Sequence, residues 1–206
     1  MNPAEVLQVL EKTGALIQKG HFQYTSGRHG KAYVNKDALY PHIGIASKIG
    51  QAFAERFAAN DIEVVVGPAL GGIILSQWTA FHLTRLMGSE VLSVYAEKVD
   101  DGLALKRGYD KLVRGKRVLV VEDIITTGVS VDKTIETTRA AGGVIMGVAV
   151  LCNRGGLTLA DLKDVPALHE LVRIPLESWS PEECPLCKDG IPLSSEYGKA
   201  KKLKSV

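Results

Sequence analysis

Short apolar runs alternate with segments of helical periodicity along much of this chain. The runs are rich in β-branched residues, and each predicts a short strand buried on both faces, over 62–66, 91–95, 118–121 and 144–151. Apolar side chains at helical spacing predict helices over 71–85 and 130–141. A stripe in steps of four residues predicts an earlier helix through Ile45, Ile49, Phe53 and Phe57.

Strands that alternate with helices are typical of an α/β fold with a mostly parallel, doubly wound sheet flanked by helices. Ligands of such sheets bind beyond the carboxyl ends of the strands. We therefore expect the functional site in the loops that follow residues 66, 95, 121 and 151.

Three segments depart from this alternation and divide the chain into an N-terminal unit, a core and a C-terminal extension. Residues 1–40 begin with a short amphipathic helix and continue as an extended hood or hairpin. Residues 96–116, inside the core of 41–175, are too polar for the interior and predict a flexible, charged lid. Residues 176–206 carry a Cys-x-x-Cys pair and end in a basic tail. We expect the tail, after Ser194, to be disordered.

Composition narrows the class of protein. The chain has 206 residues, of which 46% are hydrophobic and 23% charged, as in one globular domain with appendages. A net charge of +2 does not call for a nucleic-acid partner. Three cysteines cannot all pair internally, which favours a reducing, cytoplasmic compartment.

The sequence also gives no sign of a membrane partner. The first twenty residues lack the apolar core of a signal peptide. The uncharged stretch 64–84 is long enough to span a bilayer, but Gly-Pro and Gly-Gly interrupt it near its start. A strand, a tight loop and a buried helix are the better prediction.

The strongest chemical signal is the string 118–130, in which a buried strand runs into two acids and a hydroxyl-rich loop. Glu122 and Asp123 at the sheet edge can accept hydrogen bonds from vicinal sugar hydroxyls and help to neutralise a cationic centre. The Thr-Thr-Gly-Val-Ser loop offers hydroxyl and N–H donors at a helix start, which suits a phosphate monoester. Each piece alone could be an ordinary strand-to-helix turn. No Gly-Lys-Ser/Thr follows, which argues against a nucleotide triphosphatase.

This string resembles the signature of the type I phosphoribosyltransferases, which bind phosphoribosyl pyrophosphate (PRPP). The resemblance implies that Glu122 and Asp123 hold the ribose hydroxyls. It also implies that the following loop binds the 5′-phosphate, through Ile125, Thr126, Thr127, Gly128, Val129 and Ser130.

The loop 67–72 looks like the pyrophosphate loop of the same family. The residues expected near the ligand are Leu70, Gly71 and Gly72. Some relatives place a lysine here, so in this chain backbone N–H groups are the expected donors. A Gly-Pro turn without a ligand is the alternative.

Residues 22–37 resemble the N-terminal hood of the orotate phosphoribosyltransferases, which forms one wall of the orotate pocket. A planar anionic pyrimidine needs an aromatic or backbone surface for stacking and a cation for its carboxylate. Arg154, after the strand 144–151, can bind a carboxylate through two parallel N–H donors of its guanidinium. Thr25 stands where a lysine is often found, and a basic surface hairpin is the alternative. The expected orotate ligands are Ser26, Gly27, Tyr33, Lys36, Thr126 and Arg154.

The lid 96–116 matches the catalytic loop of this family in position and charge. By resemblance Lys98 is a catalytic pyrophosphate ligand, and Lys106 and Arg107 are further PRPP ligands. Glu97 replaces an arginine that many members carry. Because this loop often closes over a neighbouring subunit's site, the resemblance implies a homodimer with a loop contributed across the interface. A solvated run of charges is the alternative.

Together these features, over roughly residues 20–175, imply an orotate phosphoribosyltransferase, a pentosyltransferase of de novo pyrimidine biosynthesis. It would transfer the ribose 5-phosphate group of PRPP to orotate, with Mg²⁺ held mainly by PRPP, and form orotidine 5′-monophosphate and pyrophosphate. A purine or other-base phosphoribosyltransferase is one alternative, because it shares the acid pair but needs no carboxylate clamp. A PRPP-sensing regulator that binds nucleic acid is another, although no DNA-binding helical domain is evident.

Cys184 and Cys187 have the spacing of half a zinc site. Cys152, His169 or the same pair from a second subunit could complete it, whereas the five histidines show no paired metal spacing. A coincidental or redox-labile pair is the alternative reading of this Cys-x-x-Cys.

Overall fold

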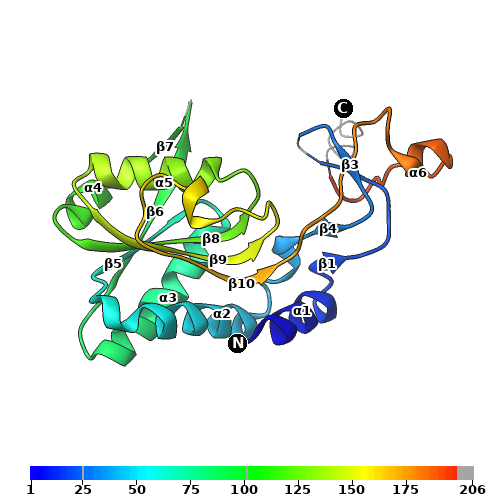
Figure 1. The fold of residues 1–206 in the computed structure, drawn as a ribbon. Helices are drawn as coiled ribbons and strands as arrows, with labels where there is room; N and C mark the ends of the chain where they lie inside the picture. The colour runs from blue at the N-terminus through cyan, green and yellow to red at the C-terminus, as the bar shows by residue number, and fades with distance from the viewer. Residues whose placement is uncertain (25, 101, 199–206) are drawn as a thin grey trace.

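The computed structural model describes residues 1–24, 26–100 and 102–198, which form an α/β fold (Figure 1). The α-helices are α1 Pro3–Lys12, α2 Ile43–Phe57, α3 Gly71–Met87, α4 Tyr109–Val113, α5 Val129–Ala140 and α6 Pro185–Lys188. The strands of the main sheet are β5 Val64–Pro68, β6 Leu92–Val99, β7 Gly102–Ala104, β8 Arg117–Ile125, β9 Val144–Asn153 and β10 Leu168–Arg173. Four short strands precede them, β1 Leu16–Ile17, β2 Phe22–Gln23, β3 His29–Gly30 and β4 Tyr33–Val34.

The main sheet has the strand order β10-β9-β8-β5-β6-β7. Its neighbouring strands are parallel except for β6 and β7, which form an antiparallel hairpin. This arrangement confirms the predicted parallel sheet. The sequence reading missed β7 and the edge strand β10, because β10 mixes apolar and charged residues.

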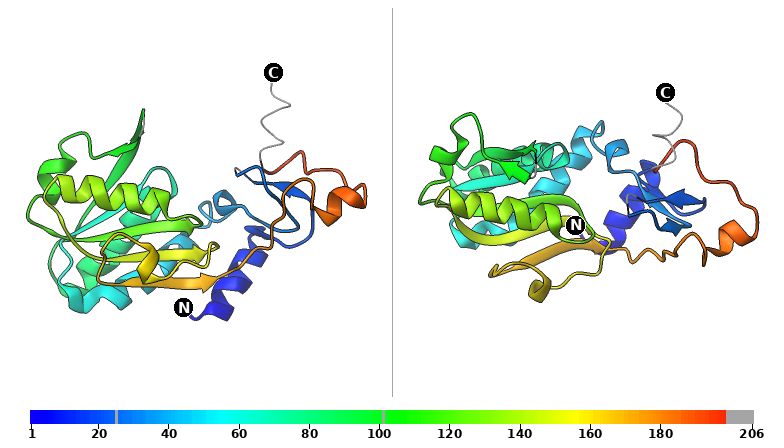
Figure 2. Two further views of the ribbon diagram at one scale, coloured as in Figure 1. Left: turned by 45° about the horizontal axis from the view of Figure 1, so that its top comes forward. Right: turned by 90° about the horizontal axis from the view of Figure 1, so that it is seen from above.

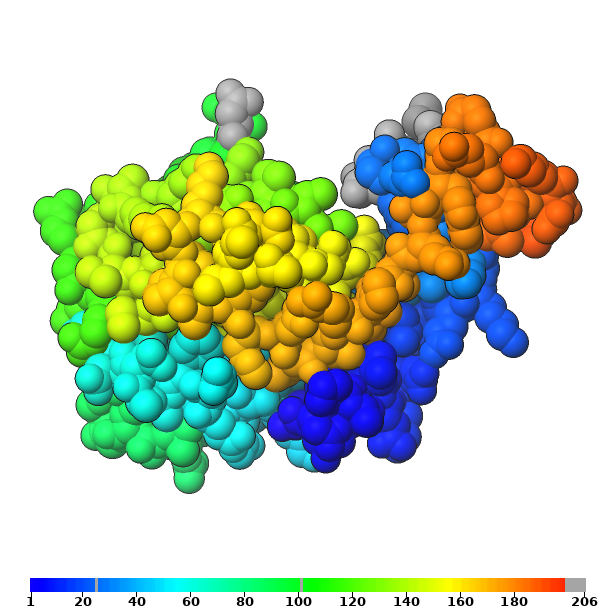
Figure 3. Space-filling view, in the orientation of Figure 1, coloured from blue at the N-terminus to red at the C-terminus, as the bar shows by residue number. Residues whose placement is uncertain are grey.

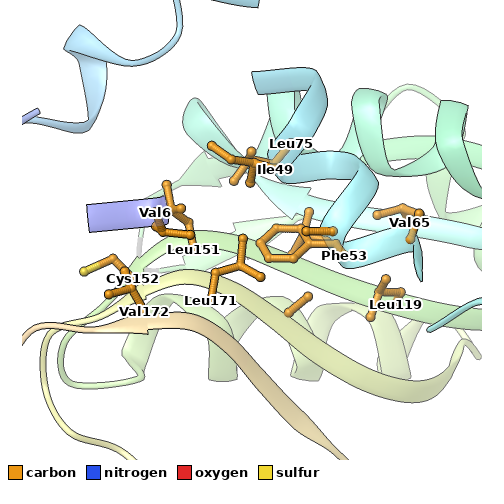
Figure 4. Packing of buried hydrophobic residues seen from close by; sticks show 14 of the residues in the cluster. Val6, Ile49, Phe53, Val65, Leu75, Leu119, Leu151, Cys152, Leu171 and Val172 are labelled. Carbon is orange, nitrogen blue, oxygen red and sulfur yellow. The ribbon is translucent and has the colours of Figure 1, made fainter. Parts of the chain in front are cut away.

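Alternate residues of the central strands pack into two different cores, because successive side chains of a strand point to opposite faces. Val65 and Leu119 face α2 and α3, where Phe53 is fully buried (Figure 4). Their neighbours Val64 and Val118 lie in the second core. Burial on both faces holds the central strands in place.

The charged lid 96–116 contains more regular secondary structure than the sequence suggested. It contains the end of β6, the antiparallel strand β7 and α4, and Ala96, Leu105 and Val113 are buried in the second core. The prediction that this segment is too polar for the interior was therefore wrong for these three apolar side chains. β7 projects beyond the helices of the sheet body (Figure 1).

The hood and the C-terminal extension lie side by side at one end of the sheet (Figures 2 and 3). β1 pairs with β4, and β2 pairs with β3, both antiparallel. The backbone of His29 exchanges two hydrogen bonds of 2.8 Å with Trp179, and the Arg28 side chain donates to Ser178. Residues 176–198 thus support the hood, whereas Thr25 and the basic tail 199–206 lie outside the described residues.

No helix in the described ranges is both long enough and apolar enough to cross a membrane. The uncharged stretch 64–84 folds as β5 and most of α3.

Candidate active site at the carboxyl edge of the sheet

The ends of β5, β8 and β9 bring three predicted loops to one edge of the sheet. β8 carries the acid pair, and its following loop leads into α5. Backbone N–H groups of Arg154 and Gly155, after β9, donate to the carbonyl of Ile125 at 2.9 and 3.2 Å. The loop after β9 is therefore fixed against the end of β8.

Asp123 is the most tightly held acid of this edge, with 1% of its surface exposed. Tyr40 donates a hydrogen bond of 2.8 Å to Oδ2, and the Lys36 ammonium lies 2.8 Å from the same oxygen. Burial disfavours the charged Lys36, but the facing Asp123 carboxylate outweighs burial and raises the pKa of Lys36 above its ordinary value. Lys36 and Asp123 therefore form a charged pair at the base of the site.

Glu122 lies beside this pair, and its surroundings raise its pKa. Burial, followed by the adjacent Asp123 carboxylate, raises the pKa of Glu122 to about 8. Its Oε1 accepts a hydrogen bond of 3.0 Å from the backbone N–H of Asp123. Burial thus favours the protonated form of Glu122, whose carboxyl group can donate a hydrogen bond to a neighbouring hydroxyl group as well as accept one.

The glycine loop between β5 and α3 packs directly against Asp123. A Cβ atom at Gly71 would overlap Oδ2 of Asp123 and the hydroxyl of Tyr40, and one at Gly67 would overlap the backbone of Gly72. Only glycine allows this approach. The Ala69–Leu70 peptide bond is cis, and the Leu70 side chain is 80% exposed.

The predicted phosphate loop lines a cavity of about 190 Å³ together with Glu122 and Ile124. The loop residues that line it are Ile125, Thr126, Thr127, Gly128, Val129, Ser130 and Val131. Helix α5 begins at Val129, so its N-terminal turn and the positive end of its dipole lie at this cavity. The structure thus brings together every residue that the resemblance assigned to the 5′-phosphate.

A second cavity, of about 560 Å³, shares Thr127, Val129 and Ser130 with the first. Lys98 and Lys133 also line it, so two cations lie next to the phosphate loop. Sequence reasoning missed Lys133. Its place three residues after Ser130, one turn into α5, was the signal that could have found it.

Arg107 and Lys106 line neither cavity. Arg107 lies on the lid with its Nε 3.4 Å from Oε1 of Glu97, and the side chains of Lys106 and Arg107 are exposed. The sequence reading placed Lys106 and Arg107 at PRPP, and within a single chain the structure does not bring them to the cavities.

The hood meets the sheet edge through Tyr24. The Arg154 guanidinium lies 4.7 Å from the centre of the Tyr24 ring, and the Tyr24 hydroxyl donates to the Ala32 carbonyl at 2.6 Å. Burial raises the pKa of Tyr24, and the nearby Arg154 opposes that shift. Tyr24 was not among the predicted ligands, although it is an aromatic residue of the same hood segment.

The remaining hood residues occupy different surroundings. Gly27 has a positive φ of 82° and donates its N–H to the Tyr24 carbonyl at 2.9 Å, which closes the turn that carries the exposed Ser26. Tyr33 packs its ring against Phe22 and Tyr197. The aromatic ring beside Arg154 is that of Tyr24. The predicted role of Tyr33 at orotate stays a prediction.

Comparison with known proteins agrees with this geometry. Residues 35–182 match the phosphoribosyl transferase domain family. The orotate phosphoribosyltransferase of Caldanaerobacter subterraneus subsp. tengcongensis is 38% identical over 195 residues, which are 94% of this chain and 96% of the relative. That of Thermotoga maritima is 37% identical over 91% of this chain and 94% of the relative.

Solved structures of lower identity share the fold. A crystal structure of the Mycobacterium tuberculosis orotate phosphoribosyltransferase has a TM-score of 0.65 at 24% identity and covers 82% of this chain and 96% of its own. An adenine phosphoribosyltransferase from Rhodothermus marinus has a TM-score of 0.59 at 23% identity, over 83% of this chain and 99% of its own. The family model and the two closer sequence relatives agree, and the chain belongs to the orotate phosphoribosyltransferases.

Proposed function

We propose that the site at the carboxyl edge transfers the ribose 5-phosphate group of PRPP to orotate, with orotidine 5′-monophosphate and pyrophosphate as products. The observation that carries this proposal is the acid pair of β8 at the sheet edge, with the cavity of the predicted phosphate loop beside Glu122 and with Arg154 in the loop that is fixed against the end of β8. The transfer is a step of de novo pyrimidine biosynthesis.

The acid pair would bind the ribose. Asp123, held as a carboxylate by Lys36 and Tyr40, accepts a hydrogen bond from one hydroxyl of the ring. Glu122, protonated near neutral pH, donates to or accepts from the vicinal hydroxyl. As the bond to pyrophosphate breaks, positive charge develops on the ring, and the fixed negative charge of Asp123 stabilises it.

The phosphate groups would bind on either side of the ribose. Thr126, Thr127 and Ser130 with the first turn of α5 receive the 5′-phosphate. Lys98 and the backbone of Gly71 and Gly72 face the departing pyrophosphate, with Lys133 as an additional cation. No covalent nucleophile is needed, so catalysis rests on positioning and electrostatics.

The residues of the site fit a magnesium ion that is held mainly by the substrate. Of the two acids, Asp123 already binds Lys36 and Tyr40, and no cluster of three carboxylates is found among the described residues. Mg²⁺ commonly takes one or two protein carboxylates and completes its shell with phosphate oxygens and water. When bound with PRPP, the ion offsets the charge of the leaving pyrophosphate.

Orotate would lie between the hood and the loop after β9. Arg154 would bind its carboxylate through two parallel N–H donors. The Tyr24 ring, which packs against the guanidinium, would keep Arg154 in position. Ser26, Gly27 and Lys36 would complete the base pocket. This arrangement favours orotate over purines and uracil, which carry no carboxylate.

The working unit would be a homodimer in which the lid of one subunit reaches the site of its partner. Lys106 and Arg107 are exposed on the lid and line neither cavity of their own chain. If the lid acts on the partner's site, Lys106 and Arg107 do not need to lie at the phosphate-binding cavities of their own chain.

The test is orotate consumption followed by ultraviolet absorbance, with purified protein, Mg²⁺ and PRPP. Adenine, hypoxanthine, xanthine and uracil serve as control bases, and Asp123→Asn serves as the inactive control. We expect loss of orotate alone. Turnover of another base would contradict the role of Arg154, and binding of PRPP without any turnover would favour a regulator.

A further inference from the structure

Four metal-binding side chains meet where the hood touches the C-terminal extension. His21 precedes β2, His29 lies in β3, Cys184 caps α6 and Cys187 lies within it. The two pairs are about 160 residues apart in sequence, yet one ligand atom from each of the four side chains lies within 4.8 Å of all the others. None of the four belongs to the active site described above.

We propose that His21, His29, Cys184 and Cys187 bind one zinc ion in a closed, tetrahedral site that fastens the hood to the C-terminal extension.

The distances between the ligand atoms fit such a site. Zinc–nitrogen and zinc–sulfur bonds of usual length in a tetrahedron give edges of about 3.4 Å between two nitrogens and about 3.6 Å between nitrogen and sulfur. Nε2 of His21 lies 3.1 Å from Nδ1 of His29 and 3.5 and 3.7 Å from the sulfurs of Cys184 and Cys187. Nδ1 of His29 lies 3.3 Å from the Cys187 sulfur.

The hydrogen bonding of His21 prepares it as a ligand. Its Nδ1 lies 2.6 Å from the carbonyl oxygen of Ile191, which can only accept, so Nδ1 carries the proton. Nε2 then presents a lone pair to the other three ligands. A backbone carbonyl on the second ring nitrogen is the usual support of a metal-bound histidine.

Burial and ligand type point to zinc in a structural role. His21, His29 and Cys184 are buried, and Cys187 is the exposed member. A set of two sulfurs and two nitrogens at tetrahedral spacing is typical of zinc, and four protein ligands leave no open position for a reaction. The site would therefore stabilise the fold without taking part in the transfer.

The structure excludes the partners considered from sequence within this chain. Cys152 lies in the core on β9, where burial raises the pKa of its thiol to about 12, and His169 lies on β10. Neither belongs to the cluster. His21 and His29 were not recognised because their spacing of eight residues becomes a pair only when the β2–β3 hairpin closes.

The zinc site would also hold the base pocket in shape. Tyr24 lies between His21 and His29 in the hairpin and contacts Arg154. Backbone bonds between His29 and Trp179 join the same two segments, as do the bonds from Arg28 to Ser178, which are exposed. A metal with four ligands adds a cross-link that these hydrogen bonds do not supply.

The experiment measures zinc in the full chain, expressed with added zinc and purified without a metal-affinity tag. We expect about one zinc ion per chain by elemental analysis. The double variant Cys184→Ser/Cys187→Ser and the single variant His29→Gln should lose it. Cys152→Ser and His169→Gln are the matched controls and should keep it.

A second measurement does not depend on the folding of any variant. The wild-type chain is stripped of metal and titrated with Co²⁺. Intense visible bands of tetrahedral cobalt with a sulfur charge-transfer band would support the site, and a chelator should lower the melting temperature of the zinc-loaded chain. A zinc-free wild-type chain that also gives no such cobalt spectrum would overturn the proposal, as would full zinc content in the double cysteine variant.

Discussion

Gly71 at the start of α3 packs so closely on Asp123 at the end of β8 that no side chain fits between them. The Cβ atom of any other residue would overlap the Asp123 carboxylate and the Tyr40 hydroxyl. The glycine loop and the acid pair, which are separate motifs in the sequence, therefore form one rigid unit. Tyr40, partly buried next to both, donates the hydrogen bond that orients the carboxylate.

Replacing Gly71 tests this unit. We expect Gly71→Ala to displace either the loop or the carboxylate and to lower kcat/KM for PRPP by about 100-fold, since misplaced catalytic groups commonly cost that much. Gly44→Ala is the matched control, because Gly44 lies in α2 with open space at its Cβ position. Steady-state kinetics of both variants decide the matter, and equal kinetics would show that the loop does not need to touch Asp123.

The raised pKa of Glu122 predicts a pH dependence of stability. The folded chain holds the Glu122 proton up to a pKa of about 8, whereas the ordinary value is 4.5. The folded state therefore binds more protons between these values, and this contribution is complete below the lower value and lost as pH rises through the higher one. Asp123 and Lys36 face the same carboxyl group, and Ser130 donates a hydrogen bond to it.

Urea unfolding from about pH 5 to about pH 9 measures this effect. The free energy of unfolding of the wild type should fall with rising pH more steeply than that of Glu122→Gln, whose amide does not titrate. Glu136→Gln removes a surface carboxylate paired with Lys163 and should keep the wild-type slope. Parallel curves for the wild type and Glu122→Gln would mean that Glu122 is ionised in the folded chain at neutral pH.

Arg154 should determine the affinity for orotate. Arg154→Lys keeps the charge but loses the planar fork that binds a carboxylate through two bonds. A charge-assisted hydrogen bond contributes about 1.5–3 kcal/mol, so we expect the KM for orotate to rise by about 10- to 100-fold. The KM for PRPP should stay near the wild-type value. Arg85→Ala, which removes an arginine beside Phe81 on α3, is the control. A rise in the KM for PRPP instead would show that Arg154 binds the phosphate groups of PRPP and not the carboxylate of orotate.

The sequence predicted the sheet and the loop that lines the first cavity because both rest on local pattern. The apolar runs before Glu122 and Gly67 mark buried strands, and parallel strands end at one edge. The string from Glu122 to Ser130 is continuous in sequence, so the order of its residues already places them in one strand, one loop and one helix start.

Contacts between distant segments could not be predicted in this way. Tyr24 meets Arg154, and Tyr40 meets Asp123, across more than 80 residues of chain, and no spacing rule links them. Leu105 and Val113 are buried although charged residues surround them in the sequence, because the β6–β7 hairpin and α4 fold back onto the second core. Tertiary packing decided these cases over local polarity.

The proposed exchange of lids between subunits can be tested with two inactive variants. Lys106→Ala/Arg107→Ala impairs the lid and leaves the core intact, whereas Asp123→Asn impairs the core and leaves the lid intact. If the lid acts on the partner's site, a mixed dimer has one site with an intact core and an intact partner lid. An equal mixture that is unfolded and refolded together should then recover about a quarter of wild-type activity, because half of the dimers are mixed and each has one working site. A mixture of Asp123→Asn with Gly71→Ala is the control and should gain no activity over the separate variants, since both changes lie in the core. No recovery in the first mixture, with dimers present by light scattering, would show that each lid serves its own chain.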